Sequence, residues 1–158
     1  MRRIALILAL LAPLPAKAGC LVFCGDPQIT DLTIAATRLA GDLGGPLPDG
    51  VDVTHMLEGG FQDRFILARL EPNDPGVAQF LKLLGLTDAD LTPENDNETA
   101  AEILDSAAAN PDWWDWQTTT NLRIAQTHSA SLPYLAVGIA AKPGVLDRYV
   151  IYLWGFET

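Results

Sequence analysis

Two strands and the turn between them are predicted over residues 133–156, PYLAVGIAAKPGVLDRYVIYLWGF. The first strand, Pro133 to Ala141, is rich in small and branched apolar residues, and the second, Leu146 to Phe156, carries large apolar side chains on both faces. Lys142-Pro143-Gly144-Val145 is a turn signal, because Pro fixes the first central φ and Gly tolerates the second. This C-terminal β-hairpin predicts an antiparallel sheet with the last strand in its core.

A strand followed by a helix is predicted upstream of the hairpin, over residues 61–85. Apolar side chains alternate on both sides of Phe61 to Leu70, which is typical of a strand inside a sheet with a layer packed on each face. Glu71-Pro72-Asn73-Asp74-Pro75 signals a helix start, because a polar cap precedes a proline. An apolar stripe follows at helical spacing, and Gly85 ends the helix.

The remaining elements complete a single α+β domain. A helix is expected from Asp26-Pro27 to the Gly44-Gly45-Pro46 stop, and another from Glu98 to Ala109 after an acidic loop over residues 87–97. Shorter strands are expected over residues 51–57 and 122–127. The order of elements predicts an antiparallel sheet of 3–5 strands with about three helices packed mainly on one face.

The first eighteen residues have the pattern of a secretory signal peptide that is cleaved. Arg2 and Arg3 precede an apolar run from Ile4 to Leu14, and Ala16-Lys17-Ala18 supplies small residues for the cleavage site. The run is too short for a membrane-spanning helix. The sequence therefore predicts a bacterial periplasmic or secreted protein whose domain covers residues 19–158, with no membrane insertion after cleavage.

The only two cysteines, Cys20 and Cys24, follow the predicted cleavage site directly. Export places them in an oxidising compartment, so an intrachain disulfide is expected. It would restrain the new N-terminus. Lipidation of Cys20 is the alternative, although Lys17 stands where a lipoprotein signal has an apolar residue. The C-x3-C spacing does not match a C-x-x-C redox motif.

The charge balance restricts the class of partner. The chain carries 10 basic and 20 acidic residues, for a net charge of −10. Removing residues 1–18 takes away three basic residues and no acidic one, which leaves −13. This balance argues against binding nucleic acid or an anionic membrane surface, because both are negatively charged.

An aromatic cluster at residues 112–116 is the most unusual local feature. Asp112 and Asp115 flank three of the four tryptophans, Trp113, Trp114 and Trp116. One interpretation is a stacking platform for sugar rings or an anchor for a partner protein. The other is that the indoles close one end of the core, with their N–H groups on loop carbonyls.

Other chemistry-bearing residues do not form a recognisable motif. His55 and His128 lack further ligands at metal-binding spacing, and the acidic run from Asp88 has Pro93 where a calcium loop needs glycine, so no metal and no cofactor is predicted. Ser129 or Ser131 with a histidine and an aspartate would lack any supporting nucleophile motif.

Three functions remain open from the sequence. The leading hypothesis is a non-enzymatic exported binding or accessory module that presents the Trp113–Trp116 loop, or a sheet face, to a protein or small ligand. The alternatives are a periplasmic hydrolase that uses Asp112 and Asp115 with His55 or His128 as base, and a structural or assembly component.

Overall fold

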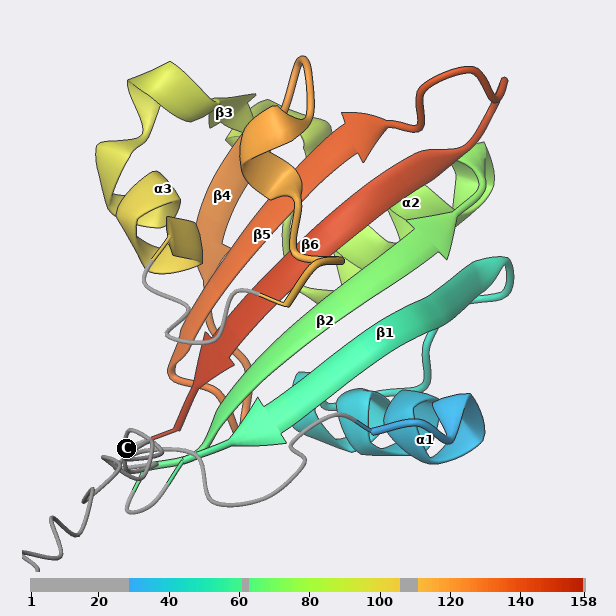
Figure 1. The fold of residues 1–158 in the computed structure, drawn as a ribbon, viewed down its shortest axis with the longest axis vertical. Coiled ribbons are helices and arrows are strands. Elements are labelled where there is room, and N and C mark those ends of the chain that lie inside the picture. Colours follow the sequence, from blue (N-terminus) through green and yellow to red (C-terminus); the bar gives the residue numbers. More distant parts are fainter. Residues whose placement is uncertain (1–28, 61–62, 106–110, 158) are drawn as a thin grey trace, which may run out of the picture.

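The computed structural model describes residues 29–60, 63–105 and 111–157, which form one six-stranded sheet with helices packed against it (Figure 1). Neighbouring strands are all antiparallel, in the order β1-β2-β6-β5-β4-β3. The strands are β1 (Val51–Gly59), β2 (Phe65–Pro72), β3 (Thr92–Pro93), β4 (Arg123–Thr127), β5 (Tyr134–Ala141) and β6 (Tyr149–Phe156). The predicted single α+β domain is confirmed, whereas the predicted signal peptide and the Cys20–Cys24 disulfide lie outside the described residues.

The C-terminal hairpin is confirmed as β5 and β6. The Val145 amide donates to the Lys142 carbonyl at 3.3 Å, and Gly144 has a φ of 74°, as the predicted turn requires. β6 pairs with β5 on one side and with β2 on the other. The last strand of the chain therefore lies in the middle of the sheet.

The predicted number of 3–5 strands is wrong, because the sheet has six. The additional strand is β3, inside the acidic segment expected to be a loop, where Thr92 and Pro93 pair with Ile124 and Arg123 of β4. Proline is tolerated there because β3 forms an edge of the sheet. Two residues are too few to show the alternation by which a strand is recognised.

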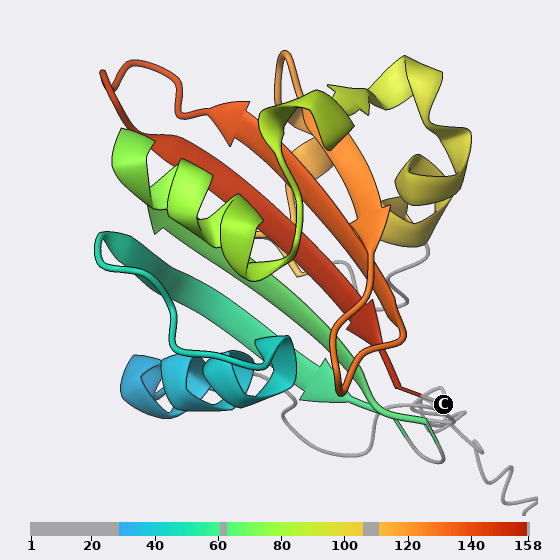
Figure 2. The same ribbon diagram turned by 180° about the vertical axis from the view of Figure 1, so that it is seen from behind.

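The helices cover both faces of the sheet: two of the three described α-helices pack on one face, as expected, and the third packs on the other. The helices α1 (Leu32–Leu43) and α2 (Asp74–Leu83) lie on one face, here called the helical face (Figure 2). The helix α3 (Glu98–Asp105) lies on the opposite face with Trp114 and Trp116, here called the tryptophan face (Figure 1). Both layers are needed because β2 and β6 are apolar on both sides, as the sequence of β2 predicts.

Polar side chains cap all three helices. Asp31 accepts hydrogen bonds from the amides of Thr33 and Ile34, so α1 begins at Leu32, whereas the predicted start at Asp26-Pro27 lies outside the described residues. Asn73 accepts from the Gly76 amide at 2.8 Å and starts α2 where the sequence predicts it. Asn97 accepts from the Ala100 amide and starts α3. Each cap pairs a donor that the helix leaves free.

Each face of the sheet has its own apolar core. Leu39, Phe80 and Ile66 are fully buried on the helical face, and Leu67, Leu104 and Ile124 are fully buried on the tryptophan face. Among the described residues, none of the helices combines the length and the apolar character that crossing a membrane requires.

Candidate functional site

The tryptophan segment, residues 111–119, lies across the tryptophan face beside α3. Trp114 and Trp116 are only 4% and 3% exposed, and the Trp114 indole N–H donates to the Leu104 carbonyl at 3.2 Å. These two indoles are core side chains. Of the predicted binding residues, Asp112 and Asp115 are exposed and Trp113 is half-buried.

A polar row runs across the sheet beneath this segment. His55 of β1, Arg69 of β2 and Tyr152 of β6 stand opposite one another on adjacent strands. The Tyr152 hydroxyl donates to Asp115 Oδ1 at 2.6 Å, and Arg69 Nε lies 3.9 Å from the same oxygen. The Trp113 ring stacks on His55 with 5.1 Å between ring centroids. The structure thus brings His55 together with two of the residues predicted as a site.

The polar row has protonation states suited to holding the tryptophan segment in place. Burial, and then the nearby Arg69 cation, lower the pKa of His55, although Glu71 and Asp115 oppose them, so the imidazole is neutral at neutral pH. Burial, and then the hydrogen bond to Asp115, raise the pKa of Tyr152, so the phenol keeps its proton. At neutral pH Asp115 therefore accepts a hydrogen bond from Tyr152, which ties the segment to the sheet.

Three buried side-chain N–H groups on this face have no hydrogen-bond partner within the described part of the chain: Arg69 Nε, Trp113 Nε1 and Trp116 Nε1. The Arg69 guanidinium also lies 3.5 Å from Glu71 through Nη1, so its charge is compensated. A buried donor without an acceptor costs free energy. The tryptophan face is therefore held together mainly by apolar and aromatic packing.

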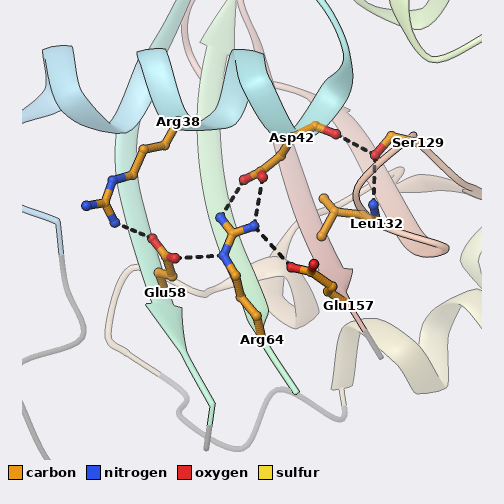
Figure 3. Close-up of polar contacts among 7 residues, drawn as sticks. All are labelled: Arg38, Asp42, Glu58, Arg64, Ser129, Leu132 and Glu157. Carbon is orange, nitrogen blue, oxygen red and sulfur yellow. Dashed lines mark hydrogen bonds and ion pairs between the residues drawn. The ribbon is translucent and has the colours of Figure 1, made fainter. Parts of the chain in front are cut away.

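The second histidine is not part of the polar row. His128 lies in the exposed loop between β4 and β5. The neighbouring Ser129 hydroxyl donates to the Asp42 carbonyl at 2.6 Å and accepts from the Leu132 amide at 3.2 Å (Figure 3). Ser129 therefore holds the loop against the end of α1, which is a structural task and not that of a nucleophile.

Metal ligands do not gather in the described part of the chain, where no group of three or more His, Cys, Asp or Glu side chains has the geometry to hold an ion. The acidic segment from Asp88 onward instead uses its carboxylates locally. Asp90 accepts from the amide and hydroxyl of Thr87, both at 2.7 Å. These hydrogen bonds lower the pKa of Asp90.

A charged cluster on the helical face joins α1 to the sheet (Figure 3). The Arg64 guanidinium donates twice to the Asp42 carboxylate, each at 2.7 Å, and once to Glu58 at 2.6 Å, and it lies 3.7 Å from Glu157. Arg38 donates to the other oxygen of Glu58. The hydrogen bonds to Asp42, more than any other contact, raise the pKa of Arg64. Each charge has a partner, so the cluster is a structural joint.

A groove of about 570 Å³ opens on the helical face, between α2 and the strands beneath it. Ligand pockets typically measure about 300–1,000 Å³. We call it the α2 groove. It is lined by Asp74, Pro75, Val77, Ala78, Leu81, Lys82, Leu86, Thr87, Asp88, Arg123 and Tyr149.

Two polar pairs bridge the walls of the α2 groove. The Tyr149 hydroxyl of β6 donates to Asp74 Oδ1 of α2 at 3.0 Å. Arg123 of β4 donates to Asp88 Oδ1, in the short 3-10 turn Asp88–Asp90, at 2.7 Å. The hydrogen bond to Asp74 raises the pKa of Tyr149, so this hydroxyl stays protonated at neutral pH. The groove therefore combines an apolar lining with a fixed polar rim.

Lys82 is the one basic side chain of the described residues that makes no ion pair with a carboxylate. The other six basic residues pair, namely Arg38, Arg64, Arg69, Arg123, Lys142 and Arg148. Lys82 is exposed, belongs to the last turn of α2 and lines the groove. An uncompensated cation thus stands at the rim of an apolar groove.

The sequence does not predict this groove. One signal was present, because Asp74, Ala78 and Lys82 recur at intervals of four and so share a face of α2. The other wall comes from segments that only the strand pairing brings to the helix. Comparison with protein-family models, with curated proteins and with solved structures finds no match to the chain, so its function has to follow from the geometry of these residues.

Proposed function

We propose that the protein is an exported binding module that takes a small ligand in the α2 groove. The observation that carries this proposal is the groove itself, an apolar hollow of about 570 Å³ with a polar rim. Ligand sites in proteins have this composition, since apolar lining supplies affinity and a few polar groups fix the orientation. We expect the protein to act outside the cytoplasm, because the first eighteen residues have the pattern of a signal peptide.

The walls of the groove are fixed in advance of any ligand. Val77, Phe80 and Leu81 bury one side of α2 against the sheet, and Asn73 caps its N-terminus. The hydrogen bond from Tyr149 to Asp74 fastens the same helix to β6. Binding to preformed walls avoids the entropy cost of ordering them, which favours affinity in a site of modest size.

The tryptophan segment supports a binding function less well. Trp114 and Trp116 are buried, and Asp115 accepts a hydrogen bond from Tyr152. A stacking platform needs exposed rings, and the segment offers only the half-buried Trp113, whose face lies on His55. We therefore propose that the ligand binds at a sheet face, in the groove between α2 and the strands, and not at the tryptophan segment.

The test fills the groove and measures binding of an environment-sensitive dye, 8-anilinonaphthalene-1-sulfonate, by its fluorescence. Ala78 is exposed on the wall of the groove, so Ala78→Phe places a ring in it. We expect the dye affinity to fall at least tenfold. Gln79→Phe adds the same ring to the next exposed residue of α2, which does not line the groove, and serves as the control.

The proposal fails if Ala78→Phe and Gln79→Phe bind the dye equally well. It also fails if only a substitution of Trp113 abolishes dye binding, because the dye would then bind on the tryptophan face. Far-ultraviolet circular dichroism of both variants establishes that each has the fold of the parent protein.

A further inference from the structure

We infer that the ligand of the α2 groove is a small amphipathic anion, with its apolar body along the groove and its anionic head group at Lys82. This inference rests on the proposed function and names the chemical class of the ligand. The head group is defined by its charge and its oxygen acceptors, as in a carboxylate, a sulfonate or a phosphate monoester.

The distribution of charges on the chain favours an anionic ligand at Lys82. Acidic residues outnumber basic ones by 20 to 10, so carboxylates to pair with are abundant. Every basic side chain of the described residues except Lys82 lies within 4 Å of a carboxylate oxygen. An anionic ligand would give Lys82 the partner that the described residues do not.

Arg123, the other cation that lines the groove, does not compete with Lys82 for the anionic head group. Arg123 is hydrogen-bonded to Asp88, and this contact raises the pKa of Arg123 and lowers that of Asp88. The Lys82 ammonium stands on a flexible four-carbon stem, so it can follow a head group at the rim while its methylenes cover apolar surface.

The groove also has a direction. Asp74 and Lys82 line it from opposite ends of α2, eight residues or about 12 Å apart along the helix axis. The Asp74 carboxylate repels an anion at its end, and Lys82 attracts one at the other. Between them the α2 wall is made of Pro75, Val77, Ala78 and Leu81. The ligand therefore lies along the helix with its head at the C-terminal turn.

The experiment compares three ten-carbon probes by isothermal titration calorimetry, each below its micelle concentration. The probes are decanoate, decanol and decyltrimethylammonium, which share the tail and differ in the charge of the head. We expect decanoate to bind about three- to fivefold more tightly than the other two, because an ion pair with an exposed lysine contributes up to about that factor.

Lys82→Gln is expected to reduce the decanoate affinity to that of decanol and to leave decanol unchanged. Gln79→Glu is the matched control, because it makes the same change of one charge unit on the same helix outside the groove. Lys82→Arg is expected to retain the preference. The affinity for decanoate should also decline with added salt in the parent protein and not in Lys82→Gln.

The outcomes separate this inference from the proposed function. If Ala78→Phe abolishes binding of all three probes while Lys82→Gln leaves decanoate unaffected, the groove is the site and the anionic class is wrong. If decyltrimethylammonium binds best, the class is likewise overturned. If decanoate binds Ala78→Phe as tightly as the parent protein, the proposed function itself is wrong.

Discussion

The two faces of the sheet differ in how completely their outer layer closes over the strands. On the tryptophan face, α3 and the tryptophan segment close over the polar row, where Tyr152 is hydrogen-bonded to Asp115 and His55 is stacked under Trp113. On the helical face, α1 and α2 leave a groove beside α2, and Lys82, which lines it, has no carboxylate partner among the described residues.

A conspicuous cluster of side chains is largely structural here, whereas the site that we propose lies beside an ordinary surface lysine. The tryptophan side chains bury large apolar areas and cover a part of the sheet that α3 alone leaves open. A binding site instead needs a concave surface with a few polar groups that a ligand can reach. Each of the following changes tests one side of this contrast.

The largest effect is expected from removing a buried indole of the tryptophan face. Trp114→Ala leaves a cavity and deletes the hydrogen bond to the Leu104 carbonyl, so we expect the free energy of unfolding to fall by about 3–5 kcal/mol. Urea denaturation measures it. Trp113→Ala, at the half-buried neighbour, should cost clearly less; an equal cost would contradict the structural role assigned to Trp114.

The charged joint at α1 should have the next largest effect. Asp42→Ala removes both hydrogen bonds from the Arg64 guanidinium and leaves that cation with Glu58 and Glu157, so we expect a loss of about 2 kcal/mol. Asp49→Ala, at an exposed aspartate, should change stability by less than about 0.5 kcal/mol. Equal denaturation midpoints for the two variants would show that the cluster does not hold α1.

A smaller effect is expected from the protonation of His55. Its pKa is lowered in the folded protein, so the unfolded chain binds the proton more readily and stability is lost as the pH falls below about 6.5. Above that pH the contribution of His55 to the free energy of unfolding is fully present. We expect His55→Gln to flatten the unfolding free energy between about pH 6.5 and pH 5, measured by denaturation at each pH.

His128→Gln is the control for this pH dependence, because His128 is the chain's only other histidine and lies in an exposed loop. This variant should keep the decline of the parent protein. If His128→Gln flattens the profile instead, the stacking of Trp113 on His55 does not govern the stability of the tryptophan face.

The parts of the fold that could be predicted from the sequence are those fixed by neighbouring residues. The hairpin at residues 133–156 and α2 carry their turn and cap signals within a few positions, and both are confirmed. Thr92–Pro93 has no such signal, and its pairing depends on β4, some thirty residues later. The face on which α3 packs depends on the path of the chain and not on its own periodicity.

The candidate site depends even more on distant contacts. Tyr149 and Asp74, which both line the groove, are 75 residues apart, and Arg123 and Asp88 are 35 apart. No local pattern shows that Lys82 has no carboxylate partner within the part of the chain that the structure describes, because this depends on where the acidic residues lie in space. The tryptophan cluster is conspicuous in the sequence by its composition. Composition alone cannot distinguish an exposed aromatic surface from a buried one.

The most direct test of the α2 groove as the binding site is a titration of the ¹⁵N-labelled protein with decanoate, followed by ¹H–¹⁵N correlation spectra. The four indole N–H signals report on the tryptophans, and the backbone amides report on the groove. We expect the shifts to concentrate in residues 74–88 and at Arg123 and Tyr149, with the indole signals of Trp113, Trp114 and Trp116 unchanged. Shifts centred on those indoles, with α2 unaffected, would contradict the account.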